Sequence, residues 1–136
     1  MTLPRQKFRE AIFLALFGLD SGGDEEGLGP VLMHELRITK KHVKEAIALA
    51  REILSLTATF DKRIASASTA YDFERIGRVE KNILRLGLFE MALLPPPVAI
   101  SEALRLAKKF AAPESTSFIN AILDNLLKHA SQQTPI

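Results

Sequence analysis

The chain has 136 residues, of which 47% are hydrophobic and 25% are charged. This length predicts a single domain that buries one continuous core, with no room for a second catalytic module. The absence of cysteine excludes disulfides, thiolate nucleophiles and cysteine-ligated metals. A formal net charge of +2 is compatible with nucleic-acid binding but is too small to indicate it. Whether the protein binds nucleic acid must be judged from where the charges lie.

The apolar segments fall short of a membrane span, which needs about 18 apolar residues. The longest of them, residues 83–94, is interrupted by Arg85 and Glu90. Near the N-terminus, the apolar run 11–19 follows charged residues and ends at Asp20 without a small-residue cleavage site. We therefore expect no signal peptide, no membrane contact and a cytoplasmic protein.

Apolar residues recur at intervals of three and four along the chain, which predicts an all-α protein. We expect about seven helices, joined by connections of a few residues into a compact bundle. In chain order they cover residues 4–19, 25–36, 39–64, 72–77, 78–94, 98–112 and 115–130, followed by a frayed tail at 131–136.

Capping and breaking residues set these boundaries. Thr39 and Asp72 are suitable N-caps because a side-chain oxygen there accepts a backbone N–H. The prolines at 95–97 lack that N–H and force extended backbone, so they end the fifth helix. Ser115 or Thr116 caps the last helix. The apolar stripes predict these buried residues: Phe8, Ala11, Ile12, Ala15 and Leu19; Val43, Ala46, Ile47, Ala50, Ile53, Leu54 and Thr57; Ile100, Ala103, Leu104, Ala107 and Ala111; Ile119, Ile122, Leu123, Leu126 and Ala130.

A second line on the first helix is a candidate binding surface. Arg5, Arg9, Phe13 and Phe17 follow one another at intervals of four, apart from the apolar stripe. Cations that hold phosphates, next to aromatic rings that stack on bases, are typical of single-stranded RNA binding. The alternative is that both phenylalanines belong to the core and that the cations are simply solvated.

Enzymatic chemistry has little support. His34, His42 and His129 are isolated and lack the spacing of a metal site. The glycine-rich segment 22–27 has neither the phosphate-loop pattern nor the glycine that an EF-hand loop needs, and no serine has a GxSxG context. We expect no enzymatic activity, no cofactor and no metal.

Three segments of the second half share a specific pattern: VEKNILRLGLFE at 79–90, VAISEALRLAKKF at 98–110 and FINAILD at 118–124. REAIFLALF at 9–17 matches more loosely. In this order and at these separations, the segments resemble the NusB family of bacterial transcription antitermination factors. The resemblance implies a seven-helix RNA-binding domain over 1–136, with subdomains of three and four helices that meet near residues 65–70.

The resemblance also implies a function. A NusB-like protein would bind single-stranded boxA-type RNA together with the ribosomal protein NusE, and would accompany RNA polymerase as part of an antitermination complex during ribosomal RNA synthesis. Each partner should raise the affinity for the other. Glu114 joins the RNA site because it lies close in sequence to Phe118. The implied site residues are Arg5, Lys7, Arg9, Glu114 and Phe118 for RNA, and Phe17 and Glu80 for NusE.

Several of these residues have simpler interpretations. Glu80 at a helix start gains about 0.3–1 kcal/mol from the helix dipole whether or not it binds a partner, and Phe118 fits a core position equally well. Gln6 lacks the charge usual in the basic segment of the family, and Phe17 lacks the hydroxyl of the usual tyrosine.

Arg85, Glu90 and Glu102 lie in apolar surroundings, where charges persist by pairing. We expect Arg85 to form a structural ion pair with one or both glutamates.

Two other functions remain open. The chain could be the N-terminal RNA-binding domain of an rRNA cytosine methyltransferase, a family that shares this fold, although its length leaves no room for a cofactor-binding domain. It could also be a homodimeric interaction protein that buries the surface of Phe13 and Phe17 between its subunits.

Overall fold

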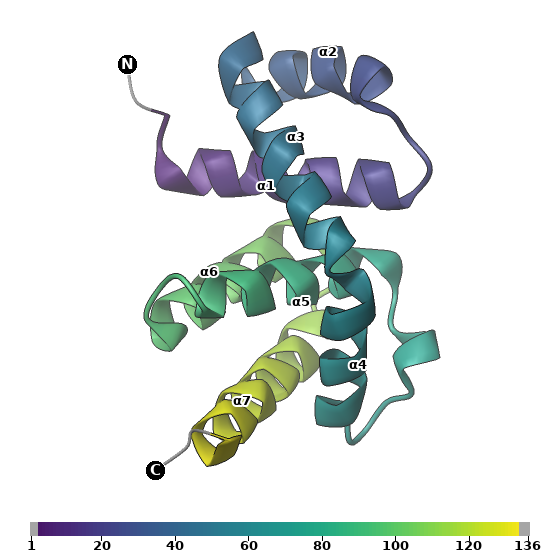
Figure 1. Cartoon of the computed structure of the whole chain (residues 1–136), viewed down its shortest axis with the longest axis vertical. Coiled ribbons are helices and arrows are strands. Elements are labelled where there is room, and N and C mark those ends of the chain that lie inside the picture. Colours follow the sequence, from purple (N-terminus) through teal and green to yellow (C-terminus); the bar gives the residue numbers. More distant parts are fainter. Residues whose placement is uncertain (1–2, 134–136) are drawn as a thin grey trace. The chain divides into compact units, whose positions relative to one another are not determined.

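The computed structural model describes residues 3–133, with side chains up to His129 (Figure 1). Within this part of the chain every regular element is a helix, which confirms the predicted all-α fold. The chain divides into two units, Met1–Leu56 and Thr57–Ile136. We predict from the sequence that the two subdomains meet near residues 65–70. The division in the structure lies earlier, between Leu56 and Thr57. Among the described residues, no helix has the combined length and apolarity needed to cross a membrane.

The first unit contains three helices: α1 (Arg5–Asp20), α2 (Glu25–Leu36) and α3 (Lys40–Ser55). Figure 1 shows α3 crossing the other two. Asp24 begins α2, because its side chain accepts the Gly27 N–H at 2.8 Å. Arg37 ends α2 in the left-handed conformation, with φ of 53°. Thr39 caps α3 as predicted, and its hydroxyl oxygen accepts the His42 N–H at 3.4 Å.

The core of the first unit follows the predicted stripes with small differences. Phe13, Leu16, Ile47 and Ile53 are its largest fully buried side chains. Ala11, Ile12, Ala15, Val43, Ala46 and Ala50 are buried as predicted. Phe8, Leu19 and Leu54, predicted to be buried, are half-buried.

The second unit contains α4 (Thr57–Ala67), a 3₁₀ turn (Phe73–Arg75), α5 (Arg78–Met91), α6 (Pro96–Phe110) and α7 (Ser115–Gln133). The central helix is α5, which contacts α4, α6 and α7. Gly87 permits this close packing: a Cβ there would lie 3.3 Å from Leu123 Cδ2 and 3.5 Å from Ala103 Cβ. Ile119, Ile122, Leu123 and Leu126 of α7 are buried as predicted. In α6, Ala103 and Ala107 are buried as predicted, whereas Ile100, Leu104 and Ala111 are half-buried.

The single helix predicted over 39–64 is wrong. The chain forms two helices there, because Leu56 donates its N–H to Ile53 O at 3.0 Å, a three-residue bond that tightens the last turn of α3. Thr57, predicted to be buried on the α3 stripe, is half-buried at the start of α4. The apolar pattern continues across this break, and neither glycine nor proline marks it.

Other boundaries move by a few residues. Asp72 makes no side-chain cap, and the expected helix at 72–77 is only the 3₁₀ turn. The prolines at 95–97 begin α6 rather than precede it, since proline fits the first helical turn. At the other end, α7 continues to Gln133, so the predicted tail begins too early. The prediction that Ala130 faces inward concerns a side chain outside the described residues. Residues 134–136, the rest of the predicted tail, also lie outside them.

Candidate nucleic-acid interface

The predicted line on α1 is only partly a surface. Arg5 is exposed and Lys7 is half-buried, so both can meet a ligand. Phe13 is 2% exposed and belongs to the core, and Arg9 is 7% exposed. Steps of four residues turn by about 40° each, which carries the middle of the line towards the core. The alternative of a homodimer that buries both Phe13 and Phe17 between its subunits is wrong for Phe13, which is already buried within its own unit. Phe17 is half-buried.

In the second unit, Phe118 of α7 forms an aromatic pair with Tyr71. The ring centroids lie 5.3 Å apart, and the ring planes are inclined by 50°. Tyr71 is 53% exposed and Phe118 is half-buried, so Phe118 is not a fully buried core residue. Both rings line a cavity of about 200 Å³ together with residues 67–70 and the Asn125 side chain. An exposed aromatic rim of this kind can take a flat, unstacked base.

The loop that carries Tyr71 is fixed by two hydrogen bonds. The Ser68 hydroxyl donates to Tyr71 O at 2.6 Å, and Asn125 Nδ2 of α7 donates to Ala67 O at 3.0 Å. The other side of the same loop borders a second cavity of about 190 Å³ lined by Asp72 and Arg75. Tyr71 thus lines the first cavity together with Phe118 and the second together with Arg75.

Sequence reasoning missed Tyr71 and Arg75. Tyr71 is the single tyrosine of the chain, and it follows the small polar connection at 65–70. An aromatic residue directly after such a connection was the sequence signal that could have pointed to it. Arg75 is highly exposed and lies 4.0 Å from Asp72, a contact too open to neutralise it strongly.

Glu80 lies half-buried in the first turn of α5, beside the start of α7. The Ser115 hydroxyl donates to Glu80 Oε1 at 2.8 Å. Glu114 is exposed immediately before Ser115, and Phe118 follows in the first turn of α7. Glu80, Glu114 and Phe118 thus belong to the second unit, whereas Arg5, Lys7, Arg9 and Phe17 belong to the first.

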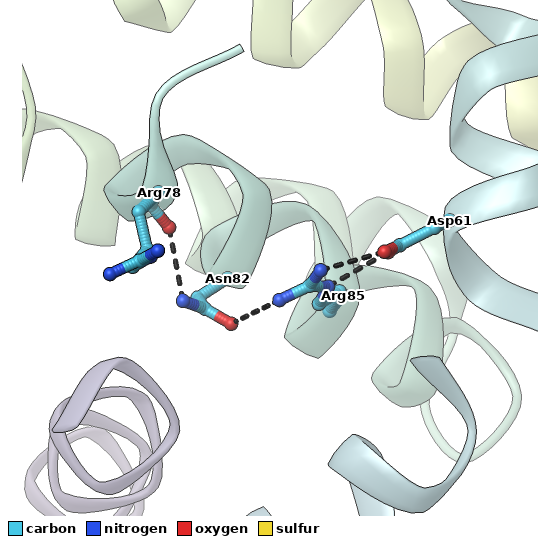
Figure 2. Close-up of polar contacts among 4 residues, drawn as sticks. All are labelled: Asp61, Arg78, Asn82 and Arg85. Atoms are coloured by element: carbon cyan, nitrogen blue, oxygen red, sulfur yellow. Dashed lines mark hydrogen bonds and ion pairs between the residues drawn. The ribbon is translucent and has the colours of Figure 1, made fainter. Parts of the chain in front are cut away.

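Arg85 forms a buried ion pair, but with Asp61 (Figure 2). Its Nε and Nη2 donate to the two oxygens of Asp61 at 2.8 and 2.7 Å, and its Nη1 donates to Asn82 Oδ1 at 3.0 Å. Asn82 Nδ2 in turn donates to Arg78 O at 3.0 Å. This chain of contacts joins α4 to α5.

Asp61 was not among the partners expected for Arg85, and a pair of Arg85 with Glu90 or Glu102 stays a prediction. Glu102 pairs with Arg105 at 2.7 Å within α6, and Glu90 is half-buried near the end of α5. Asp61 was missed because it lies on α4, which the sequence pattern joins to α3 as one helix. The structural role predicted for Arg85 stands.

Across the part of the chain that the structure describes, no group of three or more histidine, aspartate or glutamate side chains could hold a metal ion. His34 is exposed next to Glu35 at 3.7 Å, and His42 lies within 2.9 Å of the Thr39 hydroxyl.

The described part of the chain is an all-α protein whose second unit carries an aromatic pair, formed by Tyr71 and Phe118, at the start of α7. The sequence model of the NusB family matches residues 6–128, and the chain belongs to the NusB family. It is 39% identical over 132 residues to transcription antitermination protein NusB of Chlamydia pneumoniae, across 94% of this chain and 82% of the relative.

Solved structures agree with this assignment. NusB of T. maritima is 30% identical, with a TM-score of 0.74 over 94% of this chain and 93% of that one. A second match, in a crystal structure of antitermination factors NusB and NusE in complex with dsRNA, is 27% identical. Its TM-score is 0.74 over 92% of this chain and 96% of that one.

Proposed function

We propose that the protein is a transcription antitermination factor that binds boxA-type RNA together with NusE. It acts as a scaffold without chemistry of its own, in the cytoplasm, and accompanies RNA polymerase during ribosomal RNA synthesis. Curated relatives carry the name of this function, and one related structure combines NusB, NusE and RNA. The observation that carries the RNA part of the proposal is the exposed pair of Tyr71 and Phe118.

The two cavities beside this pair suit a nucleotide. A base stacked on an aromatic side chain contributes about 1–3 kcal/mol, and Tyr71 and Phe118 offer two such rings. Arg75 on the other side of the loop is placed for a phosphate. Stacking requires a base that is free of its own helix, which favours single-stranded RNA. The related complex holds double-stranded RNA, so both forms belong in the test.

Further cations for the RNA backbone come from Arg5 and Lys7, which are at least partly exposed. Arg9 contributes little by this proposal, because a side chain 7% exposed has little surface for a phosphate. The proposed contacts with NusE are Phe17 and Glu80, both half-buried. A half-buried aromatic ring can offer an apolar contact, and a half-buried carboxylate can offer a charged one.

Transcription by purified RNA polymerase tests the function. The template carries boxA upstream of a terminator, and NusE and the other antitermination factors are present. We expect the protein to raise read-through on this template and not on a matched template with a shuffled boxA. Equal read-through of the two templates would contradict the proposal.

A further inference from the structure

The carboxylate of Glu80 lies between Ser115 and Gly77. Its Oε1 accepts the hydrogen bond from the Ser115 hydroxyl at 2.8 Å. Its Oε2 lies so close to Gly77 that a Cβ on this residue would overlap it. Gly77 has φ of −65°, which any residue can adopt, so a larger residue here would displace the Glu80 carboxylate rather than strain the backbone.

Ser115 is itself inaccessible to a partner protein. It is 4% exposed and begins α7, whereas Glu80 lies in the first turn of α5. The bond therefore joins two helices and fixes a side chain that would otherwise sample several rotamers. A carboxylate has about four acceptor positions, so the bond to Ser115 leaves others for an incoming donor.

We propose that Ser115 and Gly77 are positioning residues that fix Glu80 in the orientation which NusE binds. This inference rests on the proposed function, in which Glu80 contacts NusE. A glutamate that is already ordered loses less conformational freedom on association than a mobile one. Ser115 acts through its hydroxyl, and Gly77 acts through the space that it leaves for Oε2.

Titration calorimetry of the full chain with NusE tests the proposal. Ser115→Ala removes the hydrogen bond, and Gly77→Ala displaces the carboxylate while the serine stays in place. We expect each change to weaken NusE binding about three- to tenfold, the range that follows from freeing one side chain. Ser115→Thr keeps the hydroxyl and should stay within about twofold of wild type, as should the matched control Ser101→Ala on α6.

A double-mutant cycle separates positioning from a general effect on the fold. In a Glu80→Ala background, we expect Ser115→Ala to have no further effect on NusE affinity. A loss of the same size in the Glu80→Ala background would overturn the proposal. It would also be overturned if Glu80→Ala weakens NusE binding while Ser115→Ala and Gly77→Ala both keep wild-type affinity. If Glu80→Ala itself leaves the affinity unchanged, the proposed contact fails first, and the positioning role falls with it. Thermal unfolding and RNA affinity without NusE show that the variants are folded.

Discussion

Removing Asp61 should destabilise the second unit strongly, because it takes away the carboxylate to which the buried Arg85 donates two hydrogen bonds. The side chain of Arg85 is 6% exposed and donates two hydrogen bonds to Asp61, at 2.7 and 2.8 Å. Breaking one side of a buried pair typically costs about 3–5 kcal/mol. The Asp61 side chain is 21% exposed, so solvent screens part of the interaction and about 2–4 kcal/mol is the better expectation.

This loss is a large fraction of the free energy of unfolding, which is about 5–15 kcal/mol for a typical domain. For a chain of this length, each kcal/mol shifts Tm by about 3–5 °C. Urea denaturation of Asp61→Ala, followed by circular dichroism, measures the change directly. The matched control is Asp124→Ala, which removes an exposed ion pair with Lys128 at 3.2 Å and should cost less than about 0.5 kcal/mol.

A double replacement provides the stronger test of the reasoning. Asp61→Leu combined with Arg85→Met removes both charges, so it should be less destabilising than Asp61→Ala alone, although Asn82 Oδ1 then loses the donor that Arg85 supplies. The argument fails if Asp61→Ala and Asp124→Ala destabilise equally. It also fails if the double variant is less stable than Asp61→Ala alone.

Three further predictions concern RNA. Arg5→Ala with Lys7→Ala should flatten the log–log salt dependence of RNA affinity by about 1.4, at about 0.7 per lost phosphate contact. Tyr71→Ala and Phe118→Ala should each weaken RNA binding by about 1–3 kcal/mol in fluorescence anisotropy, whereas Tyr71→Phe keeps the ring and the affinity. Glu114→Gln should lower the free energy of unfolding by about 0.3–1 kcal/mol, because a carboxylate just before α7 interacts favourably with the helix dipole. The same change should tighten RNA binding at low salt, because it removes a negative charge that would repel the phosphates.

Each of these predictions has an outcome that contradicts it. An unchanged salt slope in the double variant would remove the start of α1 from the RNA site. Wild-type affinity in both alanine variants would leave the aromatic pair without a role in RNA binding. Equal or weaker RNA affinity of Glu114→Gln at low salt would place the start of α7 away from the phosphates.

Helix positions were predictable where the local chemistry is strong. The predicted bounds of α2 agree with the structure, and Thr39 caps α3 as its side chain predicts. Periodicity also identified the buried stripes of α3 and α7. These features depend on neighbours within one turn, which is the range over which sequence patterns report structure.

Features that depend on tertiary packing were not predictable. Nothing near Leu56 marks the end of α3, so the pairing of Asp61 with a residue 24 positions away was missed. Spacing alone could not decide whether Phe13 faces the core, and Tyr71 gained meaning only from the ring of Phe118 beside it. In each case, a contact between distant segments overrides or completes the local pattern.

The binding of boxA-type RNA with and without NusE tests the central claim most directly. Labelled boxA RNA is titrated with the full-length protein, alone and with saturating NusE, beside a shuffled RNA of the same composition and a duplex of boxA. We expect NusE to lower the Kd for single-stranded boxA at least about fivefold, as thermodynamic coupling between two ligands typically does, and to have little effect on the shuffled RNA. Equal Kd values for boxA and shuffled RNA in the presence of NusE would contradict the account.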